Sequence, residues 1–373
     1  MPSQHAILSA SSAHRWLMCP RSVRLCETFE DKPSEYAAEG TEAHELCEYK
    51  LKTALGMEAE DPTTHLTRLN DEMDECATGY ANYVLEQVNE AAKTCSDPKV
   101  FIEQRVDFSR WAPDGFGTAD CLIIADGTLR VVDYKHGLGV LVEAEMNPQM
   151  MCYALGALEL FDALYDINNV SMTIYQPRRE NISSFEMSPE KLLDWADEVL
   201  KPAAELAFEG KGEFHCGEWC GFCKAKHTCR ARAEANLQLA RHDFKLPSLL
   251  EDVEIEVILS KVDELTAWAS DVKDYALQQA ISGKAWTGWK LVEGRANRKY
   301  TNEEDVIKAV FEAGFDPYEK KLLGITAMQK MLGKTKFEKL LSAYIEKPQG
   351  KPTLVPESDK RPEISCVNLD FKE

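Results

Sequence analysis

A strand that ends in an acid and a lysine constrains the fold of this chain most strongly. The segment Leu129–Lys135 opens with apolar and β-branched residues, which are typical of a buried strand, and it ends with Asp133, a tyrosine and Lys135. Successive side chains of a strand point to opposite faces, so Asp133 and Lys135 are expected on the same face. The preceding segment 117–124 is predicted to be a neighbouring strand, joined through an Asp-Gly turn, and it contributes Asp120.

Two carboxylates and an ammonium group that converge would make a divalent cation site with a lysine beside it. Such a site can activate a water molecule and stabilise the charge that develops on a phosphate. The alternative is an edge strand on which Asp133 and Lys135 are solvated, because short motifs of this kind also occur by chance. Motifs elsewhere in the chain bear on this choice.

The order of predicted elements in the N-terminal part of the chain indicates an α/β fold. Apolar residues at helical spacing predict helices at 35–55, 73–92 and 145–164, and a Ser-Pro pair begins another at 189–208. Apolar and β-branched runs predict strands at 100–106, 117–124, 129–135 and 170–175. This order predicts a small mixed central sheet flanked by helices.

The composition indicates the cellular compartment and limits the classes of partner to be expected. The chain is 44% hydrophobic and 28% charged, and no apolar run has membrane-spanning length. Because the N-terminus also lacks the basic and apolar segments of a secretory signal, we expect a cytoplasmic protein without a membrane partner. The net charge of −20 argues against a basic nucleic-acid coat protein, but it is compatible with an enzyme that has a local basic groove.

Four cysteines in one short stretch predict a metal site. They are Cys216, Cys220, Cys223 and Cys229. In a reducing compartment, thiolates at this spacing are more typical of a metal centre than of disulfides. All four would satisfy a structural zinc ion. Alternatively, three of them and the distant Cys19 would hold an iron–sulfur cluster, which would join the two ends of the core.

Taken together, these segments resemble the RecB-type nucleases of the PD-(D/E)XK superfamily, in the branch that carries an iron–sulfur cluster. That branch includes AddB-type helicase–nucleases and the nucleases associated with CRISPR adaptation, and phage-type stand-alone members are also similar. The resemblance covers residues 8 to 232. It rests on these motifs, in family order: Cys19-Pro20, Gly40-Thr41-Glu42-Ala43-His44, Gly117-Thr118-Ala119-Asp120, Asp133-Tyr134-Lys135, Gln149-Met150-Met151-Cys152-Tyr153 and the C-terminal cysteines.

The resemblance implies a restriction-endonuclease-like core with an α-rich C-terminal domain, and it assigns roles around a cation. His44, Asp120, Asp133 and the carbonyl group of Tyr134 would bind Mg²⁺ or Mn²⁺. Lys135 would orient the attacking water and stabilise the charge on the phosphate, or it would act as a base.

Other residues take roles from the same resemblance. Gln149 and Tyr153 are one helical turn apart and would lie beside the cation, in contact with the nucleic-acid backbone. Glu103 is a lesser candidate for the rim of the site or for a second cation. The implied ligands of a 4Fe–4S cluster are Cys19, Cys220, Cys223 and Cys229, with Cys216 as a spare thiol and structural zinc as the alternative.

The residues after 242 fall outside the resemblance. Patterns there predict a long amphipathic helix at 251–281, a strand-like piece at 289–292, a helix that begins with a capping box at 301–304, and short helices at 327–332 and 336–344. We therefore predict a nuclease-type domain at 1–242, an α-rich accessory domain at 243–346 and a poorly ordered tail at 347–373.

Aromatic and basic residues are mixed in one segment of the predicted accessory domain. They are Trp286, Trp289, Lys290, Arg295, Arg298, Lys299 and Tyr300. Single strands are commonly held by bases that stack on aromatic rings and by cations that follow the phosphates, so these residues are candidate nucleic-acid contacts. The alternative is a surface hairpin with ordinary packing tryptophans.

The leading hypothesis is a metal-dependent DNA exonuclease that acts on single strands or duplex ends in phage-type recombination or end processing. DNA is the expected partner, together with a phage recombination protein or a second copy of the chain, in a bacterial host if the gene is phage-encoded. The chain contains no phosphate-binding loop motif, so no motor is expected. Two other classes stay open: a non-catalytic DNA-binding or assembly module on this fold, and a zinc-stabilised protein that acts on phage partners through its C-terminal domain.

Overall fold

The computed structural model describes residues 6–30, 35–242, 252–292, 301–318, 322–345 and 355. Its contacts divide the chain into two units, Met1–Ser282 and Gly283–Glu373, each of which is described by itself. The first unit contains the central sheet together with the candidate carboxylate and cysteine ligands.

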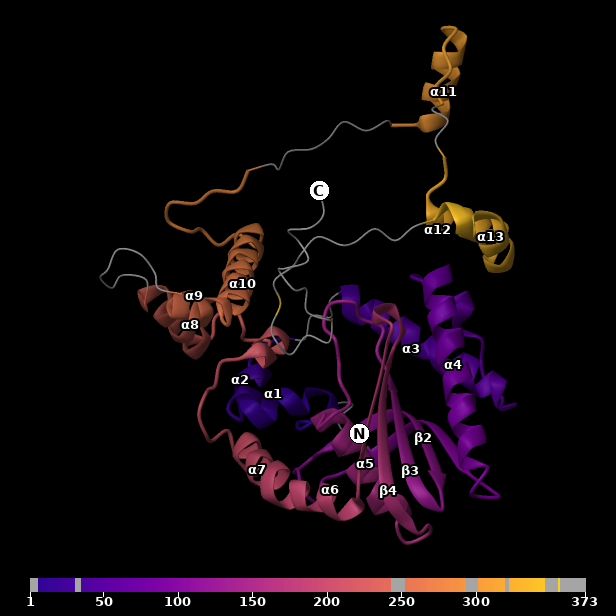
Figure 1. The fold of residues 1–373 in the computed structure, drawn as a ribbon. Coiled ribbons are helices and arrows are strands. Elements are labelled where there is room, and N and C mark those ends of the chain that lie inside the picture. The colour runs from indigo at the N-terminus through magenta and orange to yellow at the C-terminus, as the bar shows by residue number, and fades with distance from the viewer. Residues whose placement is uncertain are drawn as a thin grey trace. The chain divides into compact units, whose positions relative to one another are not determined.

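A five-stranded mixed sheet forms the centre of the first unit (Figure 1). Its strands lie in chain order and are β1 (Lys99–Asp107), β2 (Phe116–Ala125), β3 (Gly127–Tyr134), β4 (Ile167–Gln176) and β5 (Asn181–Met187). Strands β3 and β4 are parallel, and every other neighbouring pair is antiparallel. The parallel pair forms because the chain crosses back through helix α5, Pro148–Phe161. The predicted α/β core with a small mixed sheet is confirmed.

Strand β5 was not predicted from the sequence. Residues Asn181–Met187 include an asparagine and two serines, which are uncommon in strands, and alternate side chains along the strand are exposed. The strand pairs with β4 along its whole length at one edge of the sheet. This strand therefore forms through backbone pairing with β4, and such pairing is not visible in the apolar pattern of a single sequence.

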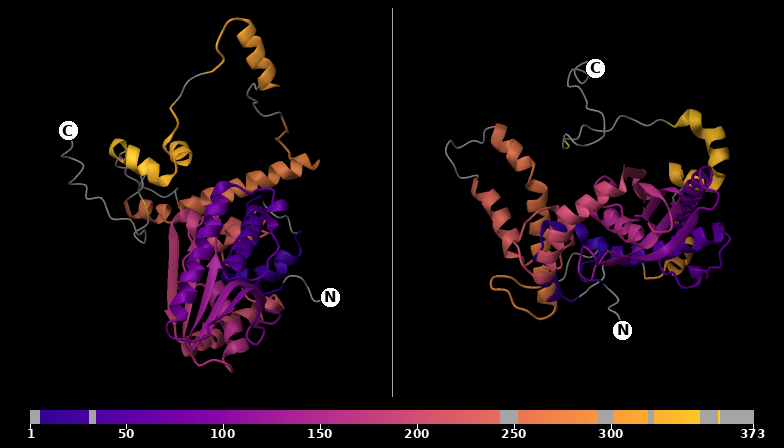
Figure 2. Two further views of the ribbon diagram at one scale, coloured as in Figure 1. Left: turned by 90° about the vertical axis from the view of Figure 1, so that its right-hand side faces the viewer. Right: turned by 90° about the horizontal axis from the view of Figure 1, so that it is seen from below.

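Helices cover both faces of the sheet (Figures 1 and 2). On one face lie α3 (Glu35–Ala54) and α4 (Asp71–Ala91), which turn towards the viewer in the left view of Figure 2. On the other lie α1 (Ala13–Met18), α5, α6 (Pro189–Trp195) and α7 (Lys201–Glu209), and the short α2 (Ser22–Glu27) follows α1. Along β2, Leu122 and Ile124 pack into one core cluster, and Cys121 and Ile123 into the other. A strand buried on both faces is continuously apolar, which explains why β2 and β3 were predictable.

The predicted helix at 189–208 is one helical run with a local irregularity. Ser188 caps its N-terminus by accepting a hydrogen bond from the Lys191 N–H group, as the Ser-Pro pair predicted. Between α6 and α7, Ala196–Leu200 forms a π-turn. Pro202 follows in the first turn of α7, where its missing N–H group interrupts the regular α-helical pattern.

The first unit continues beyond the predicted boundary at 242. It includes α8 (Arg230–His242), α9 (Asp252–Leu259) and α10 (Val262–Ile281). The single helix predicted at 251–281 is wrong in one respect: it is broken after α9, where the Ser260 hydroxyl donates to the Val257 carbonyl. Residues 243–251, where the predicted boundary falls, lie outside the described residues.

The second unit contains three α-helices among its described residues. They are α11 (Glu303–Glu312), α12 (Ile325–Leu332) and α13 (Lys334–Leu341), close to the predicted positions. The strand-like piece predicted at 289–292 is wrong, because these residues form no strand. Apart from Val355, the predicted tail lies outside the described residues. No helix in the described part of the chain is long and apolar enough to cross a membrane.

Candidate carboxylate site and cysteine cluster

Three acidic residues stand opposite one another across three neighbouring strands. The register of β1 with β2 places Glu103 opposite Asp120, and that of β2 with β3 places Asp120 opposite Asp133. The backbone pairing of both strand pairs is interrupted at this row. Between β1 and β2 the Glu103–Asp120 pair is skipped. Between β2 and β3 the pairing ends at Cys121 and Val132, one residue pair before Asp120 and Asp133. Like charges opposite each other destabilise a sheet, so the row is not explained by sheet stability.

The backbone of Glu103 has an unusual conformation that accompanies this interruption. Its φ angle is 50°, in the left-handed region that residues with a side chain rarely adopt within a strand. Such a conformation costs on the order of 1–3 kcal/mol and is concentrated at functional sites. Here, ligand atoms of His44, Glu103 and Asp120 all lie within 4.8 Å of one another.

His44 reaches this row from helix α3. Its Nδ1 atom lies 3.3 Å from Asp120 Oδ2, and its ring contacts the Tyr134 ring edge-to-face at 5.4 Å. Burial opposes protonation of His44, but the negative charge and hydrogen bond of Asp120 outweigh it and raise the pKa of His44 to about 9. The Tyr134 N–H group also donates to Asp120 Oδ2, at 2.7 Å. The predicted ligands His44 and Asp120 are thus in direct contact.

Asp133 and Lys135 point to the same side, as the alternation along β3 predicted. Lys135 Nζ lies 2.8 Å from Asp133 Oδ2, and the Asp133 side chain is only 2% exposed. Gln149 joins both residues: its Nε2 atom donates to Asp133 Oδ1 at 3.2 Å and its Oε1 atom accepts from Lys135 Nζ at 3.0 Å. Gln149 also donates to the Tyr153 hydroxyl at 3.0 Å. The solvated edge pair, which was the alternative for these residues, is therefore excluded.

The start of α5 places Gln149 at the end of β3. Asn147 caps the helix by accepting hydrogen bonds from the N–H groups of Gln149 and Met150, and Pro148 occupies the first turn. One turn later, Tyr153 packs against Gly117 so closely that a Cβ atom on Gly117 would lie 2.6 Å from the tyrosine ring. The glycine of the Gly-x-x-Asp motif is therefore required by the packing of Tyr153.

The pKa shifts of the row reflect crowded negative charge. Burial, reinforced by the charge of Asp120, raises the pKa of Glu103 to about 7. Burial also raises the pKa of Asp133 despite the nearby lysine. The pKa of Asp120 is lowered instead, because His44 outweighs its burial. The three acids of the row, when ionised, carry more negative charge than one lysine and one histidine can neutralise.

These residues fit a divalent cation of the Mg²⁺ or Mn²⁺ kind. Carboxylate oxygens and one imidazole nitrogen are the donors, a set that suits Mn²⁺ well. Asp133 Oδ2 is buried and receives no aligned hydrogen bond, although Lys135 lies near it. A bound cation would balance the charge of the row and satisfy this oxygen.

A network of hydrogen bonds and ion pairs next to the site holds α3 against the end of β3. The sequence motifs did not indicate this network. The Tyr134 hydroxyl lies 2.8 Å from His136 Nδ1, and His136 Nε2 lies 3.3 Å from Glu39 on α3. Arg178 contacts both Glu39 and Glu72, on α3 and α4, at 3.2 Å each. The motif Asp-Tyr-Lys-His could have indicated a role for His136, but its partners are distant in sequence.

The four cysteines implied as cluster ligands line one cavity. Cys19 lies at the end of α1, and the other three, Cys220, Cys223 and Cys229, come from the stretch between α7 and α8. The cavity walls also include Arg15, Ser22 and Trp219. The structure therefore brings Cys19 to three thiols that are about two hundred residues away in the chain.

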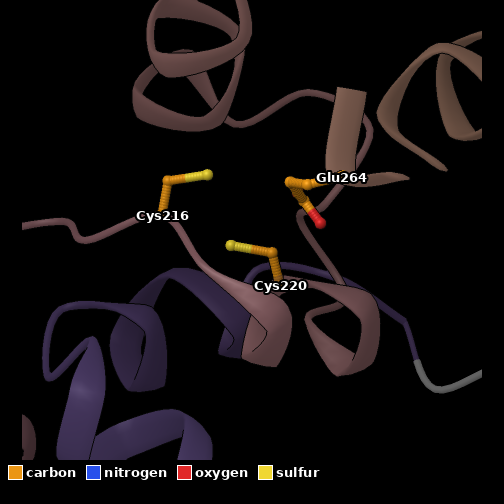
Figure 3. A group of neighbouring side chains, drawn as sticks. All are labelled: Cys216, Cys220 and Glu264. Carbon is orange, nitrogen blue, oxygen red and sulfur yellow. The ribbon is translucent and has the colours of Figure 1, made fainter. Parts of the chain in front are cut away.

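Two further cysteines lie beside these four. Cys26 Sγ, on α2, is 3.6 Å from Cys223 Sγ and also accepts a hydrogen bond from Arg15. Cys216, the predicted spare thiol, lies with Cys220 and Glu264 of α10 so that their ligand atoms are within 4.8 Å of one another (Figure 3). Cys26 was not among the predicted ligands, because it lies seven residues after Cys19 and belongs to no motif.

The predicted nucleic-acid contacts lie in the second unit. Trp289 is 83% exposed, and Lys290 is also exposed. Arg295, Arg298 and Lys299 lie outside the described residues. Trp289 and Lys290 are therefore the two of these five residues whose exposure to solvent the structure describes.

Comparison with known proteins identifies the family. One solved structure, described as the crystal structure of SSO0001, is 10% identical, with a TM-score of 0.22 and a match that covers 59% of this chain and 96% of that chain. A family described as protein of unknown function (DUF2800) matches residues 5–362, which include the sheet, the carboxylate row and the cysteine cluster. The chain belongs to this family, DUF2800.

Proposed function

We propose that this protein is a metal-dependent deoxyribonuclease of the RecB-like PD-(D/E)XK type. One observation carries the proposal: Asp120, Asp133 and Lys135 meet Gln149 and the helix-borne His44 at the interrupted end of a strand ladder. These residues come from separate segments of the chain. A purely structural ion pair would not need two acids, a lysine and a histidine in one place.

The chemistry proposed is hydrolysis of a phosphodiester bond. A bound Mg²⁺ or Mn²⁺ ion would supply an activated water and neutralise charge on the phosphate. His44, Asp120 and Asp133 would hold that ion, with the Tyr134 carbonyl group beside them, and Asp133 and Gln149 fix the direction of the Lys135 ammonium group. Lys135 would then stabilise the negative charge that develops on the phosphate oxygens.

The contacts of Lys135 support this role. In the cation-free protein burial disfavours the ammonium form, but Asp133 and Asp120 outweigh burial and raise the pKa of Lys135. The ammonium group also donates a hydrogen bond to Gln149, which holds it in place. Gln149 and Tyr153 would contact the substrate backbone next to it.

DNA is the proposed substrate, as single strands or duplex ends, with exonucleolytic cleavage in phage-type recombination or end processing. The proposed compartment is the cytoplasm of a bacterial cell, where the free cysteines of the described residues would stay reduced. A phage recombination protein or a second copy of the chain would be the partner.

Cleavage of labelled DNA tests the proposal. Linear, circular, single-stranded and double-stranded substrates are incubated with Mg²⁺ or Mn²⁺. The wild-type protein should degrade molecules with ends, and Asp133→Asn and Lys135→Ala should each lower the rate at least about 100-fold. Lys191→Ala, at an exposed lysine remote from the site, is the matched control and should act like wild type. Equal cleavage by wild type and Lys135→Ala would refute the mechanism, and DNA binding without cleavage would favour the non-catalytic module.

We also propose that Cys19, Cys220, Cys223 and Cys229 hold a 4Fe–4S cluster. The support is their common cavity, since a cluster with one distant ligand requires Cys19 to lie there. Anaerobically purified protein should contain iron and sulfide, and Cys19→Ser should lose both, whereas Cys76→Ser, a partly exposed cysteine on α4, should lose neither. Zinc without iron, unchanged by Cys19→Ser, would favour the structural zinc alternative.

A further inference from the structure

The segment that joins β3 to α5 exposes apolar side chains next to the proposed site. It runs from His136 to Asn147, so it begins directly after Lys135 and ends two residues before Gln149. Its exposed apolar residues, with their exposed fractions, are Leu138 (47%), Val140 (56%), Leu141 (42%) and Met146 (50%). Single exposed apolar residues are ordinary, but four in one short loop indicate a surface that another molecule covers.

Hydrogen bonds from the edge strands hold the backbone of this loop. The buried Gln176 side chain, at the end of β4, donates from Nε2 to the carbonyl groups of Gly137 and Val140, at 2.7 and 2.8 Å. Its Oε1 atom accepts from the Val142 N–H group at 3.1 Å, and Asn181 of β5 donates to the Val142 carbonyl at 2.8 Å. Because the backbone is already held, the exposed side chains can bind a partner with little further ordering.

The charge around the loop is complementary to a polyanion. The chain carries a net charge of −20, yet residues 135–142 contain no acid and begin with Lys135. The exposed Arg179 donates to the Leu138 carbonyl at 2.8 Å, so a second cation lies at the loop. A nucleic-acid strand combines phosphates, which cations bind, with base faces, which apolar side chains contact. Cations beside apolar side chains therefore favour a nucleic-acid strand over an apolar protein surface.

The chain length between Lys135 and the loop limits which nucleotides the loop can reach. Leu138 lies three residues after Lys135, and three residues span at most about 11 Å. Successive nucleotides of a stacked strand are about 3.4 Å apart, so Leu138 lies within about three nucleotides of a phosphate at Lys135. Bases at that position are open to apolar side chains when they are unpaired.

We propose that Leu138, Val140 and Leu141 form a base-binding loop, which contacts unpaired bases of the DNA strand beside the cleaved phosphate. The inference rests on the proposed function, because it takes Lys135 as the place of that phosphate, and it adds unpaired bases as the feature of the substrate that is recognised. Leucine and similar side chains insert between bases in other nucleic-acid complexes. The loop would favour single strands and open duplex ends over continuous duplex.

Binding of labelled oligonucleotides to the full-length protein tests this inference. Fluorescence anisotropy, with Ca²⁺ in place of Mg²⁺, compares a thymidine single strand with an abasic strand of the same length. The variants are Leu138→Ser/Leu141→Ser, Leu138→Ser and Leu160→Ser. Leu160 is 45% exposed and lies on α5 about 16 Å along the helix from Gln149, so it is the matched control. Circular dichroism confirms that each variant is folded.

Wild type should bind the thymidine strand more tightly than the abasic strand. Leu138→Ser/Leu141→Ser should weaken binding of the thymidine strand at least about fivefold, because apolar contacts with the bases are lost. Its binding of the abasic strand and its salt dependence should stay within about twofold of wild type, because the phosphate contacts remain. Leu160→Ser should bind both strands like wild type.

Unchanged binding of the thymidine strand by the double variant, or an equal loss on both strands, would overturn the inference. If the double variant does not fold, Leu138→Ser decides by the same comparison of the two strands. A second copy of the chain is the other candidate occupant. A wild-type dimer in light scattering that the double variant abolishes, with unchanged DNA binding, would assign the loop to that contact and refute base binding.

Cleavage assays on the same proteins separate this inference from the proposed function. If binding depends on the bases and on the loop but no DNA is cleaved, the nuclease proposal fails and the base-binding loop stands. If DNA is cleaved and the double variant binds and cleaves like wild type, the nuclease proposal stands and the base-binding loop is refuted.

Discussion

At the scale of single residues, Asp120 is the point at which the candidate site is assembled. Its carboxylate contacts His44, accepts the Tyr134 N–H group and lies opposite both Glu103 and Asp133. It remains ionised because His44 outweighs the effect of burial. The carboxylate of Asp120, on β2, therefore contacts residues of helix α3 and strand β3 and stands opposite a residue of β1.

The His44–Asp120 contact predicts a pH dependence of stability in cation-free protein. The pKa of His44 is raised from its ordinary 6.5 to about 9, so the contact contributes fully below pH 6.5 and is lost as the pH rises through about 9. The His44 side chain is 34% exposed, so solvent screening reduces the contribution to on the order of 1 kcal/mol.

Urea denaturation in the presence of a chelator measures this contribution. Between pH 7 and pH 9.5, the free energy of unfolding of the wild type should fall by about 1 kcal/mol more than that of His44→Ala. The difference between the two proteins removes the effect of other titrating groups such as Glu103, whose raised pKa acts between 4.5 and about 7. Parallel pH profiles for both proteins would show that His44 is not held by Asp120 in solution.

Gly117 predicts a defect of packing that reaches the site. A methyl group there would lie 2.6 Å from the Tyr153 ring and 3.1 Å from Ala10, so Gly117→Ala should lower the free energy of unfolding by about 1–3 kcal/mol. Displacement of Tyr153 should also reduce DNA cleavage. Gly139→Ala, where a Cβ atom meets nothing within 4 Å, is the control for stability and should leave the free energy of unfolding unchanged. An undisturbed Gly117→Ala protein would mean that Tyr153 packs differently.

At the scale of elements, the site depends on where helices begin. Helix α5 starts directly before Gln149 because Asn147 caps it, and this start aims Gln149 at Asp133 and Lys135. The apolar pattern predicted the helix at 145–164, but α5 occupies Pro148–Phe161. Periodicity locates a helix within a few residues, whereas the cap locates the first turn, and this site depends on the first turn.

Asn147→Ala is expected to destabilise this start. It removes the two hydrogen bonds that Asn147 accepts from the N–H groups of Gln149 and Met150, and a third that its Nδ2 atom donates to the Glu143 carbonyl, and should lower the free energy of unfolding by about 1 kcal/mol in urea denaturation. Ser188→Ala, at the α6 cap with its single bond of 3.4 Å, should cost less. The reverse order of the two variants would contradict the assignment of Asn147 as the stronger cap.

The elements themselves were largely predictable where both faces are buried. Strands β2 and β3 and helices α3 and α4 follow from apolar runs and helical spacing, because burial on the sheet requires those patterns. The edge strand β5 was not found, and the strand predicted at 289–292 does not form. Edge strands and short apolar pieces depend on whether a neighbour pairs with them, which the local sequence does not specify.

At the scale of the whole first unit, the cysteine stretch is fastened to helix α10. Arg232 of α8 is 1% exposed and pairs with Glu264 and Asp271 of α10, and Lys226 also pairs with Asp271. The His227 ring stacks on Tyr275 at 4.4 Å. These contacts explain why the compact unit extends to Ser282 rather than ending near 242.

Removal of one of these acids should loosen α10. Asp271→Ala leaves buried Arg232 with one acidic partner, Glu264, and removes the ion pair of Lys226, so the free energy of unfolding should fall by about 2 kcal/mol. Asp274→Ala, an exposed acid on the same helix, should change it by less than about 0.5 kcal/mol. Equal stability of the two variants in urea denaturation would mean that the ion pairs do not hold α10 in solution.

The sequence alone determined the elements that carry the chemistry: alternation along β3 puts Asp133 and Lys135 on one side, and helical spacing puts Gln149 and Tyr153 on one face. It also identified the four cysteines that line one cavity. Only the tertiary structure decided that Glu103 stands opposite Asp120, that Cys26 reaches Cys223, and that α10 contributes Glu264 beside Cys216. The physical reason is that strand register and helix packing are set by contacts between distant segments, whereas periodicity records only which side of each segment is buried.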